Sequence, residues 1–333
     1  MSGISGKYPS ATNPLLLGLS LPSFTKFQIA FEEKPYLASA NDAVWKNENE
    51  TKSLGQAMNM KGLFFLGFLA LGLSACQRGM PLETAKFPAE LVQFKAIVET
   101  PIFTGTGQDT WDKQIRERGF IRKEGGLYHL WYTGYSPASP IKLLGYASSK
   151  DGLVWQRKSS ESIHPGQWVE DMCVMKWRGT YFMFAEGEGD IAHLLISKDR
   201  IHWEEKGNLD IRSRSGGPIK PGPYGTPTVI RANGKWHLFY ERDDQGIWLA
   251  TSSDLKTWTN VQDEPVIALG PSAYDAHAVA MNQVIRYKGM YYGFYHASAF
   301  ADWHEWSTNV AVSADLIHWK KYDQNPKIGR AHV

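Results

Sequence analysis

The stretch from Trp168 to Trp203 reads WVEDMCVMKWRGTYFMFAEGEGDIAHLLISKDRIHW. Its three short apolar runs, Cys173–Trp177, Tyr181–Ala185 and Ile191–Ile196, are separated by a glycine-marked turn and a glycine-rich loop. Runs of about five apolar residues between such turn signals are typical of β-strands. The stretch ends in Ser-x-Asp-x3-Trp, in which the Asp and Ser side chains bond nearby backbone amides while the tryptophan packs beneath them. We therefore predict three consecutive strands and a tight turn.

The same unit recurs along the chain. The Ser-x-Asp-x3-Trp pattern occurs at Ser149–Trp155, Ser197–Trp203, Ser252–Trp258 and Ser313–Trp319. A Gly-x-aromatic turn precedes each copy, at Gly126–Tyr128, Gly179–Tyr181, Gly234–Trp236 and Gly289–Tyr291. A four-strand unit that repeats every ~40–50 residues is the signature of a β-propeller blade, and four copies of a compound pattern disfavour a β-sandwich. We predict an all-β, five-bladed β-propeller of four-stranded antiparallel blades, with four blades readable.

The beginning of the chain does not share this pattern. Met60-Lys61, an apolar run over 62–73 and a small-residue site ending in Cys76 form the pattern of a bacterial lipoprotein signal. The apolar run is too short to span a bilayer as a mature helix. We expect residues 1–59 to be upstream sequence translated in error, 60–76 to be the signal with lipidation at Cys76, and 77–86 to be a tether. The protein would be an exported lipoprotein, in the periplasm or at the cell surface, held to the membrane only by this lipid.

The propeller domain is expected over residues 87–327, with one strand at Val92–Val98. The last six residues, 328–333, resemble a translated sequencing adapter, and the chain ends soon after Trp319. An open ring leaves an unpaired sheet edge, so we expect the last blade to be truncated. With Cys76 lipidated, Cys173 is the one remaining cysteine; no intrachain disulfide can form, and its apolar surroundings favour a buried hydrophobic role.

Composition excludes several function classes. The chain has 36 basic and 34 acidic residues, so it lacks the excess of positive charge that is typical of nucleic-acid-binding proteins. The sequence contains no Cys/His metal spacing, no phosphate-binding loop and no Gly-x-Ser-x-Gly motif. We therefore predict no cofactor, no metal and no serine nucleophile, and we expect a monomer. Aromatic residues make up 13% of the chain, which suits both packing between blades and stacking on sugar rings.

Propeller geometry predicts where the chemistry lies. The start of the first strand and the end of the second strand of each blade border the same mouth of the central channel. The first-strand starts carry Trp111, Asp112, Arg116, Glu117, Arg118, Glu170, Asp171, Tyr224, Asp275 and His277. The second-strand ends carry Tyr132, Glu186, Glu241, Arg242, Asp243 and His296. Two carboxylates, one protonated and one ionised, are the minimum for cleaving a glycosidic bond, so this density of carboxylates predicts a carbohydrate substrate.

Between Trp111 and Trp319, the blade pattern and the placement of acids resemble the five-bladed propeller glycosidases, of the arabinanase and β-xylosidase type (family 43) and of the invertase and levanase type. The resemblance implies an Asp base or nucleophile in the first blade, an Asp that tunes the acid in the second, and a Glu acid in the third. Asp171 matches the second-blade Asp. Asp112 and Glu117 compete for the first-blade role, and Asp112 is preferred.

The third blade departs from this pattern, because Gly225 stands where the resemblance implies a Glu. Glu241 is the first substitute for the proton donor, Glu186 the second and His277 the third. We expect a glycoside hydrolase in which the remaining rim residues bind substrate. These are Trp111, Arg116, Arg118, Glu170, Tyr224, Arg242, Asp275, His277 and His296. A glycoside phosphorylase on the same fold is one alternative, and a surface glycan-binding propeller without catalysis is another.

Overall fold

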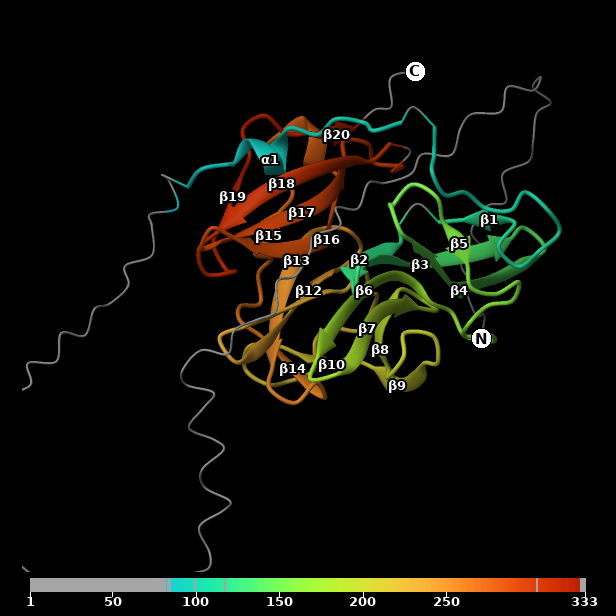
Figure 1. Cartoon of the computed structure of the whole chain (residues 1–333). Helices are drawn as coiled ribbons and strands as arrows, with labels where there is room; N and C mark the ends of the chain where they lie inside the picture. The colour runs from blue at the N-terminus through green and yellow to red at the C-terminus, as the bar shows by residue number, and fades with distance from the viewer. Residues whose placement is uncertain (1–81, 83–84, 99, 117, 304, 330–333) are drawn as a thin grey trace, which may run out of the picture.

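The structure is a computed structural model that describes residues 82, 85–98, 100–116, 118–303 and 305–329. Almost all of its regular structure is β, and the strands form four sheets arranged as the blades of a propeller (Figure 1). The prediction of an all-β propeller is therefore confirmed, with four blades in the described part of the chain. The fifth blade stays a prediction.

The first two blades are built from strands that follow one another across each sheet. The first blade contains β2 (Phe120–Glu124), β3 (Leu127–Ser136), β4 (Ser139–Ser149) and β5 (Gln156–Arg157), and β1 (Gln114–Ile115) pairs with β3. The second blade contains β6 (Glu170–Trp177), β7 (Thr180–Gly187), β8 (Ile191–Ser197) and β9 (Glu204–Asn208). The three strands predicted between Trp168 and Trp203 are thus confirmed as β6, β7 and β8.

The third and fourth blades repeat this order with additions at their edges. The third contains β11 (Thr228–Ala232), β12 (Lys235–Glu241), β13 (Gly246–Ser252) and β14 (Thr257–Asn260), with β10 (Asp210–Arg212) parallel to β14 and β15 (Ile267–Ala268) beside β13. The fourth contains β16 (Ala278–Tyr287), β17 (Met290–Ser298), β18 (Ser307–Ser313) and β19 (Trp319–Lys321), with β20 (Ile328–Gly329) beside β18. The first strands of neighbouring blades, β2, β6, β11 and β16, contact one another at the centre.

The repeated turn forms the hydrogen bonds that the sequence predicts. Asp199 Oδ1 accepts the backbone N–H groups of Ile201 and His202, at 3.0 and 2.9 Å. Ser197 Oγ accepts the N–H of Arg200, and the Trp203 indole donates to the Arg200 carbonyl. The turns that begin at Ser149, Ser252 and Ser313 repeat the Ser and Asp bonds.

In the second, third and fourth blades, the tryptophan that ends the turn packs against the preceding blade. The ring of Trp203 meets Trp131 of β3 edge-on at 6.3 Å, Trp258 meets Phe184 of β7 at 5.8 Å, and Trp319 meets Phe239 of β12 at 5.7 Å. Each partner lies at the same distance after its Gly-x-aromatic turn. The same type of aromatic contact therefore recurs at each interface between consecutive blades of the described chain.

The segment that precedes the first blade packs on the fourth blade and on the first blade, the two blades at the ends of the row of four. The helix α1 (Ala89–Val92) buries Leu91 against the fourth blade, and Phe94 lies edge-on to Phe294 at 6.3 Å. Further along, Phe103 packs at 6.3 Å from Trp155 of the first blade. The strand predicted at Val92–Val98 is wrong. The chain there takes the end of α1 and an irregular path, in which Val92 and Phe94 pack on the face of the fourth blade while Ile97 and Val98 are exposed.

The interpretations of 1–59, of the signal 60–76 with Cys76, and of the adapter-like end stay predictions. The first two lie outside the described residues, as does most of the tether. Among the residues that are described, no helix is long and apolar enough to cross a membrane. Cys173 is buried as expected, with its Sγ 3.4 Å from the backbone nitrogen of Val229.

The packing of α1 makes a testable prediction. Leu91→Ala removes a side chain that is 1% exposed, and we expect it to lower the free energy of unfolding by about 2–5 kcal/mol, the usual cost of an unfilled buried leucine site. Ile97→Ala, in the same segment but 75% exposed, is the matched control and should change stability by less than about 0.5 kcal/mol. Chemical denaturation measures both, and equal effects would contradict the packing role of α1.

Candidate active site

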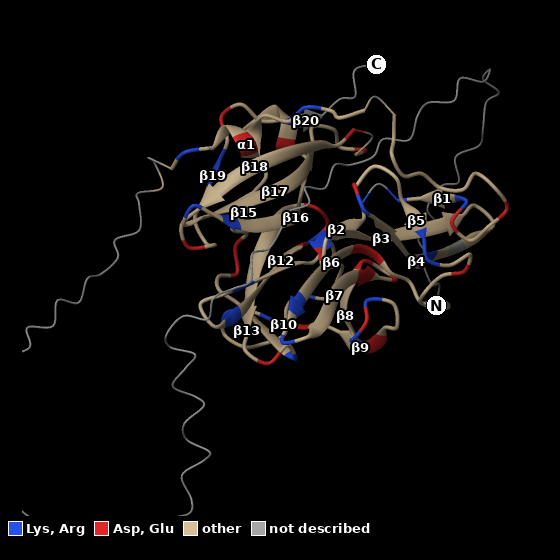
Figure 2. Ribbon diagram, in the orientation of Figure 1, with Lys and Arg blue, Asp and Glu red and all other residues tan. Residues whose placement is uncertain are grey.

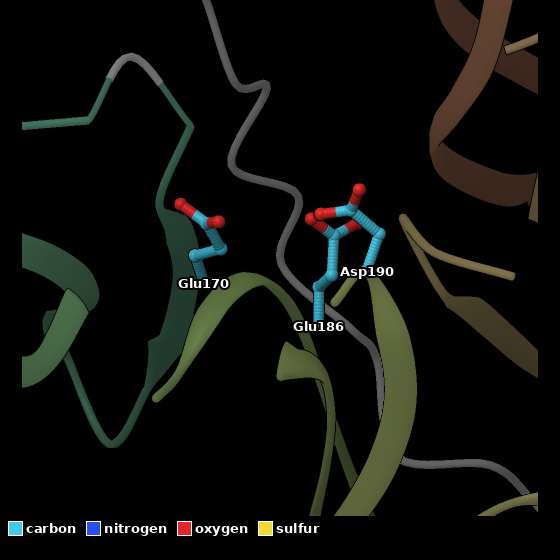
Figure 3. Close-up of side chains that lie close together, drawn as sticks. All are labelled: Glu170, Glu186 and Asp190. Atoms are coloured by element: carbon cyan, nitrogen blue, oxygen red, sulfur yellow. The ribbon is translucent and has the colours of Figure 1, made fainter. Parts of the chain in front are cut away.

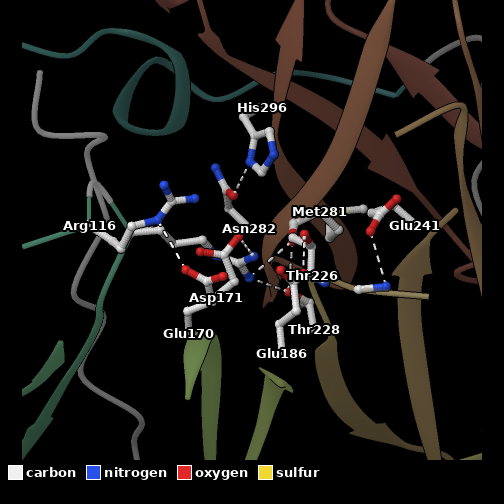
Figure 4. Close-up of polar contacts among 12 residues, drawn as sticks. Arg116, Glu170, Asp171, Glu186, Thr226, Thr228, Glu241, Met281, Asn282 and His296 are labelled. Atoms are coloured by element: carbon white, nitrogen blue, oxygen red, sulfur yellow. Dashed lines mark hydrogen bonds and ion pairs between the residues drawn. The ribbon is translucent and has the colours of Figure 1, made fainter. Parts of the chain in front are cut away.

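The start of β6 places two consecutive carboxylates at the mouth of the channel. Glu170 is paired in register with Glu186 of β7, and the ladder is interrupted before Cys173. Within this irregularity Asp171 has φ +49°, a left-handed conformation that few non-glycine residues adopt. In a regular strand, neighbouring side chains point to opposite faces. Here both carboxylates join the polar network of Figure 4.

Arg118 links all four blades across the centre. It precedes β2 in the first blade and is 4% exposed. Its Nη1 lies 3.3 Å from Asp171 Oδ2 in the second blade, and its Nη2 donates to Thr228 Oγ1 in the third and to the Met281 carbonyl in the fourth. The structure therefore assigns Arg118 to holding Asp171 and the central strands.

Arg116 lies beside the other carboxylate of β6. Its Nε is 3.1 Å from Glu170 Oε2, and the Trp168 indole donates to Glu170 Oε1 at 3.0 Å. Burial raises the pKa of Glu170, Arg116 opposes this rise, and the charge of Asp171 adds to it. Figure 2 shows the acidic segments of β6 and β7 next to the basic segment that leads into β2.

Glu186, at the end of β7, is a buried carboxyl with one anchored oxygen. Its Oε2 accepts the backbone N–H of Thr226 at 2.7 Å and lies 3.4 Å from the Thr226 hydroxyl. Burial raises the pKa of Glu186 well above its usual range, and the charges of Asp171 and Glu170 raise it further. Among the described residues, none donates a hydrogen bond to its Oε1, which leaves that oxygen for a substrate.

Glu241, at the end of β12, approaches Gly225 from the other side. Its Oε1 accepts the Gly225 N–H at 3.0 Å, and its Oε2 accepts the Asp244 N–H at 2.6 Å. Burial and then the Asp244 charge raise the pKa of Glu241 to about 8. Both of its oxygens are engaged by backbone donors, so Glu241 is less available to a substrate than Glu186.

Gly225 lies between these two glutamates. A Cβ at this position would stand 2.2 Å from Glu186 Oε2 and 2.6 Å from Glu241 Oε1, far inside van der Waals contact. The position at which the resemblance implies an acid is therefore filled by carboxylates that arrive from β7 and β12. This contact explains why a glycine stands there.

Asp190 brings a further carboxylate to the mouth from the loop after β7. One oxygen each of Glu170, Glu186 and Asp190 lies within 4.8 Å of the others (Figure 3). Oxygen groups of this kind suit hard cations such as Ca²⁺, but Arg116 already faces Glu170 and the Thr226 N–H already holds Glu186. We assign no metal to the cluster. The closeness of the like charges instead favours the protonated form of one of them.

The fourth blade contributes His296 and Asn282 to the same mouth. His296, at the end of β17, is buried and lies 2.6 Å from Asn282 Oδ1 through its Nδ1. Its ring meets that of Trp306 edge-on at 4.7 Å. Figure 4 shows His296 and Asn282 beside Arg116 and the β6 carboxylates.

The predicted base Asp112 is engaged elsewhere. Its Oδ2 lies 2.7 Å from Arg157 Nε and accepts the Tyr132 hydroxyl, and its Oδ1 accepts the Thr110 hydroxyl. These partners lie in the first blade or, for Thr110, in the segment just before it. None of the described contacts joins Asp112 to the acidic cluster. Trp111 stacks on Tyr132 at 5.8 Å. Glu117, its rival for the base, lies outside the described residues.

Asp275 is held by the outer strand of the fourth blade rather than by the mouth. It is the last residue of the 3-10 helix η4 (Ala273–Asp275), is fully buried, and its carboxylate lies 2.6 Å from Lys321 Nζ of β19. Burial raises the pKa of Asp275, and Lys321 opposes this rise. The contact with β19 supports a structural role.

Three other predicted residues shape the surroundings. The hydroxyl of Tyr224 donates to the Leu209 carbonyl, and Arg242 Nη2 donates to the Lys220 carbonyl at 2.6 Å. His277 is exposed, and its carbonyl accepts from Gln245. The side-chain bonds of Tyr224 and Arg242 thus go to backbone groups of the third blade.

Sequence reasoning missed Asp190, Thr226, Thr228, Asp244 and Asn282. Asp190 and Asp244 lie on the loops between the second and third strands, which reach the same mouth. A search extended from strand ends to these loops would have found them. Thr226, Thr228 and Asn282 act through backbone groups or through other side chains, and no sequence pattern indicates them.

No family model matches the chain. It is 26% identical over 226 residues to the 1,2-β-oligomannan phosphorylase of Thermoanaerobacter sp., an alignment that covers 62% of this chain and 73% of that enzyme. Among solved structures, a candidate glycoside hydrolase of Parabacteroides distasonis superposes with a TM-score of 0.55 at 16% identity, over 69% of this chain and 81% of that one.

A second solved structure comes from the GH130 family of mannoside phosphorylases, described as containing glycoside hydrolases that target β-1,2 mannosidic linkages in Candida mannan. It superposes with a TM-score of 0.50 at 14% identity, over 64% of this chain and 68% of that one. These structural similarities establish a shared propeller fold. In sequence, the chain is similar to an enzyme that processes glycosides.

The position of Gly225 makes a prediction that needs no substrate. Gly225→Ala places a methyl group against two buried carboxyls, and we expect the free energy of unfolding to fall by about 1–3 kcal/mol, the usual cost of overpacking. In Gly217→Ala, the matched control, the new Cβ would lie no closer than 3.6 Å to a neighbouring side chain. Thermal and chemical denaturation compare the two variants. Equal stability would show that Glu186 and Glu241 do not pack around this glycine.

Proposed function

We propose that the chain is a glycoside hydrolase in which Glu186 protonates the leaving oxygen of the scissile bond. The observation that carries the proposal is the environment of Glu186. The carboxyl is buried, is held through one oxygen by the Thr226 N–H, and lies beside the negative charges of Asp171 and Glu170. These conditions favour a protonated carboxyl near neutral pH, which is what a general acid requires.

The other carboxylates receive roles from their contacts. Asp171, paired with Arg118, raises the pKa of Glu186 and thereby keeps the proton on it. Asp190 is exposed and has an oxygen within 4.8 Å of one of Glu186, so it is our candidate for the second carboxylate that the reaction needs. It replaces Asp112 in that role, because Asp112 is bound by Arg157.

Water is favoured over phosphate as the acceptor by the charge of the site. Arg116 and Arg118, the arginines within the cluster, each face a carboxylate. A phosphate dianion would meet Glu170, Asp171 and Asp190 with little uncompensated positive charge. The name of the Thermoanaerobacter relative favours the other outcome, a phosphorylase, and it makes β-1,2-linked mannosides the first substrates to test.

We also propose export through a lipid anchor at Cys76. This part of the proposal rests on the signal-like pattern of residues 60–76. Radiolabelled fatty acid incorporation in a bacterial host, with Cys76→Ser as the control, tests it independently of activity.

Product analysis separates the two reactions. With β-1,2-mannooligosaccharides, the hydrolase proposal predicts free sugar at the same rate in phosphate-free buffer and with added phosphate. Removal of divalent ions by EDTA should leave this rate unchanged, since no metal is assigned to the site. A requirement for phosphate, with a sugar 1-phosphate as product, would replace the hydrolase with a phosphorylase, and binding without either product would indicate a glycan-binding protein.

The pH profile tests the role of Glu186. Because Glu186 must be protonated to act, activity should fall as the pH rises through its raised pKa. Asp171→Asn removes a negative charge that raises this pKa, so the alkaline limb should move to lower pH, while the amide oxygen can still accept from Arg118. Glu186→Gln should lower kcat by about 10²–10⁴-fold at every pH, the usual contribution of a general acid. An unchanged alkaline limb in Asp171→Asn, or full activity in Glu186→Gln, would refute the assignment.

A further inference from the structure

The loop between the second and third strands differs in the fourth blade. In the first three blades this loop spans 137–138, 188–190 and 242–245, whereas in the fourth it spans 299–306. Asp190 and Asp244 show that these loops border the acidic cluster, because Asp190 lies beside Glu186 and the Asp244 N–H binds Glu241. The longest of the four loops therefore lies at one side of the same mouth.

This loop holds a tryptophan in solvent on a strained backbone. Trp303 is 43% exposed and has φ +56°, a conformation that bulky side chains rarely adopt. The turn is fixed at its start, where the Trp303 N–H donates to the Phe300 carbonyl at 3.1 Å and the Phe300 N–H donates to Ser298 Oγ. Folding gains little from an exposed indole, and strain of this kind tends to persist at functional sites.

The base of the loop is tied to the central network. Trp306 packs edge-on to His296 at 4.7 Å, and His296 lies 2.6 Å from Asn282. Asn282 follows Met281, whose carbonyl accepts from Arg118. The aromatic loop is thus connected through side chains and backbone to the residue that holds Asp171.

We propose that Trp303 is a stacking platform for a sugar ring of an oligosaccharide, at a subsite next to the one where the bond is cleaved. The flat indole face suits the apolar C–H face of a pyranose ring. This inference rests on the proposed function, because it assigns the loop to a glycan rather than to a protein partner.

The division of the mouth supports a glycan as the occupant. Arg118, Asp171 and Glu186 gather at one side of the mouth, whereas the loop of the fourth blade offers the exposed indole of Trp303. A substrate of one or two sugar units would fill the acidic side alone. A longer chain would extend over Trp303, so the platform should contribute only when the substrate is long enough.

Binding in the background of Glu186→Gln tests the platform without turnover. The probes are β-1,2-mannooligosaccharides of two to five units, followed by β-1,4-linked xylo-, manno- and cello-oligosaccharides, measured by titration calorimetry. In that background, Trp303→Ala should weaken binding of the longest oligosaccharide of the linkage that binds by about tenfold. This is the loss expected for about 1.4 kcal/mol of aromatic contact. Its effect on the disaccharide should be small. Trp303→Phe should recover most of the loss.

Val154→Ala is the matched control, since Val154 is an exposed apolar residue of the first blade, 69% exposed. It should leave affinity at every length unchanged. The proposal that Trp303 binds a sugar would be overturned by equal affinity of the Glu186→Gln protein with and without Trp303→Ala at all lengths. Failure of every oligosaccharide to bind would also overturn it. If Trp303→Ala loses affinity only for long oligosaccharides, and the protein with Glu186 intact cleaves none of them, the sugar-binding role of Trp303 stands and the hydrolase proposal is rejected. If the protein cleaves long substrates and Trp303→Ala does not change that cleavage, the hydrolase proposal stands and the sugar-binding role of Trp303 is rejected.

Discussion

The buried guanidinium of Arg118 is the contact on which the centre of this propeller depends. An arginine side chain cannot lose its proton in a protein, so a buried one must be met by acceptors or its burial is strongly unfavourable. Asp171, Thr228 and the Met281 carbonyl supply those acceptors from three different blades. The same ion pair fixes Asp171, whose charge raises the pKa of Glu186. The ion pair between Arg118 and Asp171 therefore both joins the blades at the centre and fixes the charge that raises the pKa of Glu186.

In the acidic cluster, carboxylates from two neighbouring strands occupy the place where the family resemblance implies an acid. If the third blade is compared with the family resemblance alone, Gly225 stands where an acid is implied, and the acid is missing. In space, Glu186 and Glu241 occupy the volume that a side chain at 225 would need. Both carry carboxyls whose pKa is raised by burial. The third blade then supplies backbone N–H groups from Gly225 and Thr226, and the neighbouring strands supply the acids.

The repeat could be predicted because its determinants are local. In each copy, a Ser and an Asp two residues apart bond backbone N–H groups of the same turn. The second-strand aromatic lies at a constant distance from its glycine. The roles of Asp112 and Asp275 could not be predicted in this way. Their partners, Arg157 and Lys321, lie about 45 residues away along the chain, and nothing in the local sequence indicates that those cations will reach them. Asp171, Glu186 and Glu241 were named from strand ends, but their separate roles depend on burial and on distances between blades.

The two aromatic contacts of the N-terminal segment redefine where the folded domain begins. Phe94 lies on Phe294, and Phe103 lies on Trp155, so this segment takes the place of neighbouring blades at both ends of the series. A shortened protein designed to start at the first strand of the first blade would expose an aromatic surface on two sheets at once. For any recombinant version, the safe N-terminal boundary therefore lies before Ala85, well upstream of the first repeat.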